Sequence, residues 1–98
     1  MPAEEAERTA ERWIENAPTY RFDGYGLRLI DHQQLESYPV QHALTYEFTS
    51  SHAGYGNRQG KVLAQVLTRH EIEVRLSGGR VTSAIIDRRW DELRQQKT

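Results

Sequence analysis

The fold of this chain is decided by the stretch VLAQVLTRHEIEVRLSGGRVTSAIID, residues 62–87. Its first part repeats with the two-residue period of a β-strand, through Val62, Ala64, Val66, Thr68, His70, Ile72, Val74 and Leu76. This alternation runs past the usual strand length of about five or six residues, so it predicts one strand bent around residues 68–70, or two strands in succession. Gly78 and Gly79 accept the positive φ angles of a tight hairpin turn, and residues 81–87 form the returning strand.

A second alternating segment lies upstream, and it predicts the partner strand. Its inward positions are Val40, His42, Leu44, Tyr46 and Phe48. Matching the apolar faces pairs Phe48 with Val62, Tyr46 with Ala64, Leu44 with Val66 and His42 with Thr68. The Gly78–Gly79 hairpin pairs Leu76 with Val81, Val74 with Ser83, Ile72 with Ile85 and His70 with Asp87. These registers gather His42, His70 and Asp87 on the apolar face.

The remaining elements complete an α+β domain that spans residues 1–98. Apolar residues at helical spacing predict a helix that Pro18 ends near Asn16, and they are Ala3, Ala6, Ala10, Trp13, Ile14 and Ala17. Residues 19–22 form a short extended piece, residues 27–33 a strand, and residues 88–96 a short C-terminal helix anchored by Trp90 and Leu93. We therefore expect the N-terminal helix to pack on a curved antiparallel sheet of about four strands.

Composition excludes several classes of function. The chain has 98 residues, a net charge of -1 and no cysteine, so disulfides and thiolate chemistry are excluded and a reducing, cytoplasmic location is expected. Neither a secretory signal nor a long apolar run is present, so no membrane association is expected. Acidic residues interrupt the arginines of the C-terminal half, which disfavours nucleic-acid binding.

Three stretches resemble a group of small uncharacterised prokaryotic proteins. They are APTYRFDG at residues 17–24, YEFTSSHAGYGNRQGKVLAQVLTRH at residues 46–70 and AIIDRRWDEL at residues 84–93. Members of that group often carry arginine at the position of Ser51, proline at that of Arg69 and glycine at that of Arg89. The resemblance implies no activity. A helix on a curled antiparallel sheet is also similar to cystatin-type rolls, a scaffold that serves several functions.

The segment HAGYGNRQG, residues 52–60, is the first candidate binding site. Several of its residues tolerate positive φ, so backbone N–H groups can converge on an anion, and they are Gly54, Gly56, Asn57 and Gly60. Arg58 offers a bidentate donor for a carboxylate or phosphate, His52 a tunable donor, and Tyr55 a cover for a ligand. The alternative interpretation is a long hairpin connection whose glycines only permit turns.

The second candidate site is the predicted cluster of His42, His70 and Asp87. A carboxylate that holds a histidine is the geometry of an oriented general base, or of a metal ligand with its supporting group. The alternative is a structural polar pair at the end of the sheet. The spacing matches no known metal motif, so neither a metal nor a cofactor is expected.

These observations predict a small non-enzymatic binding or regulatory module. Its 52–60 loop would bind an anionic ligand or a protein partner through His52, Tyr55 and Arg58. The chain would be a monomer or a weak homodimer. The alternative is a small hydrolase or metal-dependent enzyme that uses His42, His70 and Asp87.

Overall fold

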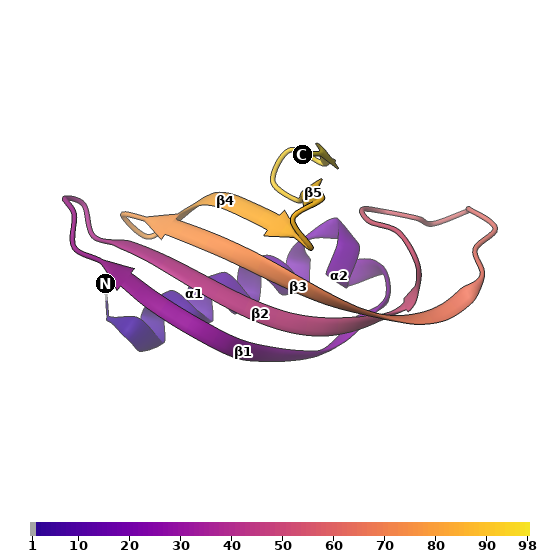
Figure 1. Ribbon diagram of the computed structural model, residues 1–98, viewed down its shortest axis with the longest axis horizontal. Helices are drawn as coiled ribbons and strands as arrows, with labels where there is room; N and C mark the ends of the chain where they lie inside the picture. Colours follow the sequence, from indigo (N-terminus) through magenta and orange to yellow (C-terminus); the bar gives the residue numbers. More distant parts are fainter. Residues whose placement is uncertain (1) are drawn as a thin grey trace.

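The computed structural model describes residues 2–98, which form two helices and six strands (Figure 1). In chain order, the elements are α1 (Ala3–Asn16), α2 (Pro18–Asp23), β1 (Gly24–Leu35), β2 (Gln41–His52), β3 (Gln65–Ser77), β4 (Arg80–Ile86), β5 (Trp90–Asp91) and β6 (Gln96–Lys97). The strands form one antiparallel sheet in the order β1-β2-β3-β4-β5-β6. The predicted α+β class is confirmed, but the sheet has six strands rather than about four.

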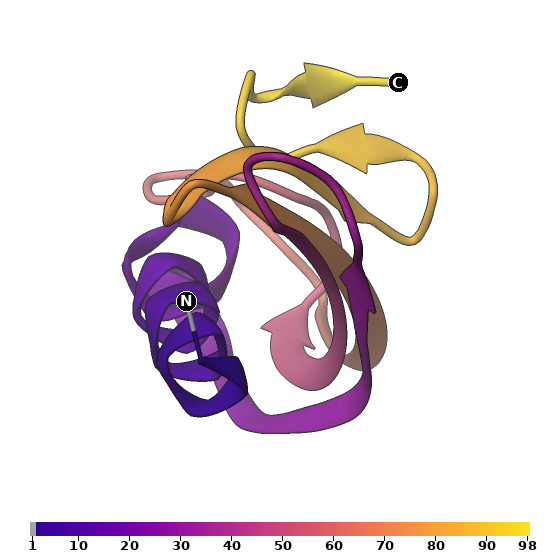
Figure 2. The same cartoon turned by 90° about the vertical axis from the view of Figure 1, so that its left-hand side faces the viewer.

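The sheet curves around α1 without closing, and the core lies between them (Figure 2). Alanines on the inner face of α1 let the helix backbone approach the strands closely, because a small side chain needs little space. Ala6 and Ala10 are fully buried, as is Ile14 one turn further on. The strands supply the rest of the core through Leu44, Tyr46, Phe48, Ile72, Val74, Leu76, Ala84 and Ile86.

Tyr46 joins the sheet to α1. Its hydroxyl donates to Glu11 Oε2 at 3.0 Å, and the Glu7 carbonyl oxygen, at 3.2 Å, lies within reach of the same proton. Burial raises the pKa of Tyr46 far above its ordinary value, and the hydrogen bond to Glu11 and the negative charges of Glu11 and Glu7 raise it further. The folded protein therefore holds this proton more tightly than the unfolded chain does.

This difference predicts a loss of stability in alkali. The contribution of Tyr46 is fully present below pH about 10, its unfolded pKa, and is lost as the pH rises above that value towards the folded pKa. We expect the free energy of unfolding of the wild type, measured by urea denaturation between pH about 8 and 11, to fall more steeply above pH about 10 than that of Tyr46→Phe. Equal slopes would contradict the assignment. Substitution of the fully exposed Tyr38 by phenylalanine is the matched control.

The segment before β1 differs from the prediction. Residues 19–22 were expected to be extended, but they lie in the short helix α2. Pro18 occupies the first position of this helix, where its fixed φ and its missing N–H cost nothing. The same proline ends α1 and begins α2, because it holds Ala17 in the extended conformation at φ -75° and ψ 150°.

Gly24 allows the sharp passage from α2 into β1. A Cβ atom at this position would lie 2.5 Å from Cδ2 and 2.8 Å from Cα of Tyr20. We expect Gly24→Ala to lower the free energy of unfolding by about 2–3 kcal/mol, since the backbone of α2 must move. Gly60→Ala is the control, because it carries only the cost of positive φ, about 1 kcal/mol, in open space. Equal losses in denaturant titrations would contradict this explanation.

The register of β2 and β3 differs from the prediction by a large even shift. Phe48 pairs with His70 rather than with Val62, and His42 pairs with Leu76 rather than with Thr68. The connection between the strands is longer than expected, because β3 begins only at Gln65. An even shift leaves the same side chains on the buried face, so the alternation could not reveal the error. Val62 is fully exposed as a result.

The register of β3 and β4 was partly correct. Leu76 pairs with Val81, as the glycine turn predicts, but an irregularity follows at once between Arg75 and Leu76. It places one additional residue in β4, so Val74 pairs with Ala84 instead of Ser83, and Ile72 with Ile86 instead of Ile85. This bulge keeps Ala84 and Ile86 in the core.

The expected C-terminal helix over residues 88–96 is not formed. Asp87 and Arg88 have φ angles of 53° and 59°, and the chain reverses its direction at these residues. Trp90–Asp91 then pairs with β4 as β5, and Gln96–Lys97 pairs with β5 as β6. Two successive residues in the left-handed region cannot begin a right-handed helix.

Candidate functional site

Arg58 ties the 52–60 loop to α2. Its side chain is 2% exposed, and its Nη2 lies 2.6 Å from Oδ1 of Asp23. The guanidinium also donates to the carbonyl oxygens of Gly54 and Thr19, and its Cζ lies 4.8 Å from the ring centre of Phe22. The group that was expected to meet a ligand therefore neutralises a carboxylate of the protein itself.

His52 meets the same carboxylate from the end of β2. Its backbone N–H donates to Oδ2 of Asp23 at 2.9 Å, and its Nδ1 lies 3.1 Å from that oxygen. Asp23 thus binds both of the basic side chains, His52 and Arg58, that were predicted to donate hydrogen bonds to an anionic ligand. The loop is held in place by these contacts at the point where it leaves the sheet.

Tyr55 folds back over the C-terminal segment. Its ring stacks on Trp90 with centroids 5.6 Å apart and an interplanar angle of 9°, and its hydroxyl donates to Oδ2 of Asp87 at 3.0 Å. Burial raises the pKa of Tyr55, and the hydrogen bond and negative charge of Asp87 act in the same direction. Tyr55 therefore covers the second candidate site rather than open solvent.

That second site contains a hydroxyl, an imidazole and a carboxylate in series. Nδ1 of His70 lies 2.6 Å from Oδ2 of Asp87, and Nε2 of His70 lies 3.1 Å from Oγ of Ser50. The other carboxylate oxygen of Asp87 accepts the backbone N–H of Glu71 at 2.9 Å. The predicted contact of His70 with Asp87 is confirmed, although the pairing of the two residues across the strands was only approximate.

The order of these groups is that of a Ser-His-Asp triad. A carboxylate accepts hydrogen bonds, so the proton on Nδ1 of His70 faces Asp87. However, the hydroxyl of Ser50 donates its single proton to the carbonyl oxygen of His52 at 2.9 Å, so this proton does not point to Nε2 of His70. Ser50 is 0% exposed and His70 is 2% exposed. A substrate has no access to the hydroxyl in this conformation.

His42 does not join this cluster, which corrects the prediction. It pairs with Leu76, whereas His70 pairs with Phe48, and six residues along a strand separate the two histidines by about 20 Å. Nδ1 of His42 instead lies 2.9 Å from Nε2 of His32. The register shift explains the error.

His32 continues this second chain of polar groups to α1, since its Nδ1 lies 2.9 Å from Oε2 of Glu7. His32 was not predicted as a site residue, although it lies in the predicted strand over residues 27–33. Among residues 2–98, no group of three or more histidine, cysteine, aspartate or glutamate side chains is arranged to hold a metal ion.

Glu92 is a further buried polar residue, and no sequence signal identified it. Its side chain accepts the backbone N–H of Thr19 at 2.9 Å, the hydroxyl of Thr19 at 2.6 Å and Nε1–H of Trp90 at 2.9 Å. The hydroxyl of Thr19 in turn accepts the N–H of Gly56 at 2.6 Å. Glu92 thus joins the C-terminal segment, α2 and the 52–60 loop.

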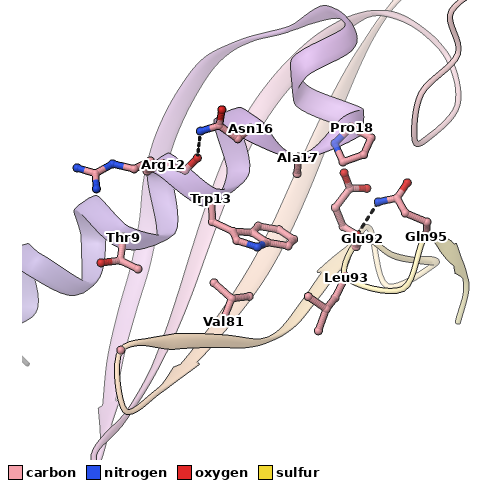
Figure 3. Close-up of a pocket in the computed structure, with 11 residues that line it drawn as sticks. Thr9, Arg12, Trp13, Asn16, Ala17, Pro18, Val81, Glu92, Leu93 and Gln95 are labelled. Atoms are coloured by element: carbon pink, nitrogen blue, oxygen red, sulfur yellow. Dashed lines mark hydrogen bonds between the residues drawn. The ribbon is translucent and has the colours of Figure 1, made fainter.

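Two cavities adjoin this region. A polar recess of about 590 Å³ lies between α2 and the 52–60 loop and is lined by Asn16, Pro18, Arg21, Phe22, Asn57 and Gln59. An open groove of about 670 Å³ runs between α1 and the C-terminal half of the sheet (Figure 3), and its lining includes Trp13, Asn16, Pro18, Val81, Glu92 and Leu93. Both volumes are in the range of small-molecule sites, about 300–1,000 Å³.

No described helix is both long enough and apolar enough to cross a membrane. Comparison of the chain with protein-family models, with curated proteins and with solved structures finds no match.

Proposed function

We propose that the protein is a small non-enzymatic binding module that takes an anionic ligand in the recess between α2 and the 52–60 loop. The observation that carries the proposal is the buried ion pair of Arg58 with Asp23, which fixes one wall of this recess. Arg21 adds a positive charge on the opposite wall, and the amides of Asn57 and Gln59 add donors from the loop. These are the groups that a carboxylate or phosphate requires.

Preorganisation supports this interpretation. A loop that is ordered before binding does not lose its conformational entropy when the ligand arrives, so more of the contact energy contributes to affinity. The contacts of Arg58, His52 and Tyr55 with Asp23 and Asp87 supply that order. In this proposal, the three residues named by the sequence position the site instead of contacting the ligand. We also infer a cystatin-like roll from the curved sheet around a helix, since such a scaffold is compatible with binding.

Chemical-shift mapping by two-dimensional NMR tests the proposal with sodium acetate and inorganic phosphate as probes. We expect saturable shifts at the backbone of Arg21 and at the side-chain amides of Asn57 and Gln59. Arg21→Gln should abolish them, because it removes the charge and keeps a side chain of similar polarity. Arg8→Gln, an exposed position on α1 outside the recess, should leave them intact. Shifts that avoid the recess would refute the proposal.

A second candidate function is hydrolysis, and the serial contact of Ser50, His70 and Asp87 favours it. In this alternative, the 52–60 loop moves with Tyr55 and opens the hydroxyl to substrate. A fluorophosphonate probe, which reacts with activated serines, provides the test. Labelling of Ser50 that His70→Gln prevents would support a hydrolase. Absence of labelling in wild type and in Tyr55→Ala would leave the three groups with a structural role.

A further inference from the structure

We propose that the ligand is a single-chain amphipathic anion, whose charged head lies in the recess and whose apolar tail lies in the groove of Figure 3. This inference rests on the proposed function and specifies its ligand. The two cavities share Asn16 and Pro18 at the corner between α1 and α2. In this proposal, one molecule passes over this corner and occupies both cavities.

The side chains of the groove match an apolar tail. Trp13 extends from α1 towards Val81 of β4 and towards Leu93, which follows β5 (Figure 3). Leu93 is 43% exposed, and Trp13 and Val81 are half-buried, so a tail that covers them removes apolar surface from water. That burial is favourable in proportion to the area covered.

The charges of the region orient the ligand. Arg12 and Glu92 line the groove with opposite charges, so together they give it no net attraction for an anion. Arg21 lies in the recess and attracts one. The head is therefore favoured in the recess and the uncharged tail in the groove, which a neutral or cationic amphiphile would not reproduce.

A homologous series of sodium carboxylates, from acetate to dodecanoate below their micelle concentrations, tests the inference by NMR. We expect all of them to shift Arg21, Asn57 and Gln59. Only the longer ones should also shift the indole N–H of Trp13 and the methyl groups of Leu93. Affinity should rise by up to about fourfold per added methylene, the factor that corresponds to about 0.8 kcal/mol, until the groove is filled.

Single substitutions distinguish binding of the charged head in the recess from binding of the apolar tail in the groove. Leu93→Asn should flatten the dependence on chain length and leave acetate binding unchanged, whereas Arg21→Gln should weaken every member of the series. Val62→Asn replaces a fully exposed residue outside the groove and should change neither. If all carboxylates bind equally and shift only the recess, the amphipathic ligand is refuted and the anion site remains.

Two other results have different meanings. If no carboxylate or phosphate shifts the recess, the proposed function itself fails. If dodecanol binds the groove as tightly as dodecanoate, and Arg21→Gln changes neither affinity, the head has no role and the inference is overturned. Because acetate reports on the recess and chain length reports on the groove, the two failures are distinguishable.

Discussion

Replacement of Arg58 by methionine is expected to lower the free energy of unfolding by about 3–5 kcal/mol. The substitution keeps an unbranched side chain but removes the cation that neutralises Asp23, whose side chain is 8% exposed. Asp23 would keep its contacts with His52, but a buried carboxylate that loses its neutralising cation retains its cost of desolvation. The loop also loses the bonds from Arg58 to Gly54 and Thr19. Urea denaturation at neutral pH measures the effect.

Two further variants test whether the loss of the ion pair causes this effect. Arg28→Met removes an exposed arginine that pairs with Glu47 across β1 and β2, and it should cost less than about 1 kcal/mol. The double substitution Asp23→Leu/Arg58→Met should recover part of the loss, since it leaves no unpaired charge. If Arg58→Met costs no more than Arg28→Met, the 52–60 loop is not fixed by this ion pair.

The second large effect is expected at Asp87. Asp87→Ala should lower the free energy of unfolding by about 2–4 kcal/mol, because it leaves several donors without their acceptor. Those donors are Nδ1 of His70, the hydroxyl of Tyr55 and the backbone N–H of Glu71. Alanine also fits poorly at a φ of 53°, because its Cβ atom disfavours positive φ. Denaturant titration gives the total, and faster hydrogen exchange at the amide of Glu71 localises it.

A conservative variant separates the charge from the backbone. Asp87→Asn keeps a side chain that tolerates positive φ and an oxygen that can accept from Glu71, so we expect a smaller loss than for alanine. Glu73→Ala, at an exposed position on β3, should change stability by less than about 1 kcal/mol. Equal effects of all three substitutions would show that the contact of Asp87 with His70 contributes nothing.

The sequence predicted the main elements because their patterns are local. Alternation identifies β2, β3 and β4, helical spacing identifies α1, and two glycines identify the turn between β3 and β4. The alternation could not predict the length of the connection between β2 and β3, since a strand that shifts by an even number of residues buries the same face. The C-terminal helix was wrong because the periodicity of residues 88–96 does not show the positive φ angles at Asp87 and Arg88.

Only part of the candidate site could be predicted from the sequence, for a related reason. The contact of His70 with Asp87 survives a small error of register, because the side chains reach across the additional residue. The predicted contact of His42 with His70 and Asp87 is not formed, because the register of β2 and β3 differs from the prediction by more residues. Ser50 and Glu92 carried no local signal, because each is an ordinary residue that becomes part of a cluster only through tertiary contacts. The sequence named the loop residues His52, Tyr55 and Arg58 but not their internal partners.

The contact of Glu92 with Thr19 also sets an order of events during synthesis. The two residues are 73 positions apart, and Thr19 is itself joined to Gly56. On the ribosome, β1, β2 and β3 can pair while Thr19 still lacks its acceptor, so this end of the nascent domain stays incomplete until residue 92 emerges. Contacts across such separations slow folding. We therefore expect residues 90–97 to dock after β1, β2 and β3 have paired, which completes the walls of the groove and secures the loop beside the recess.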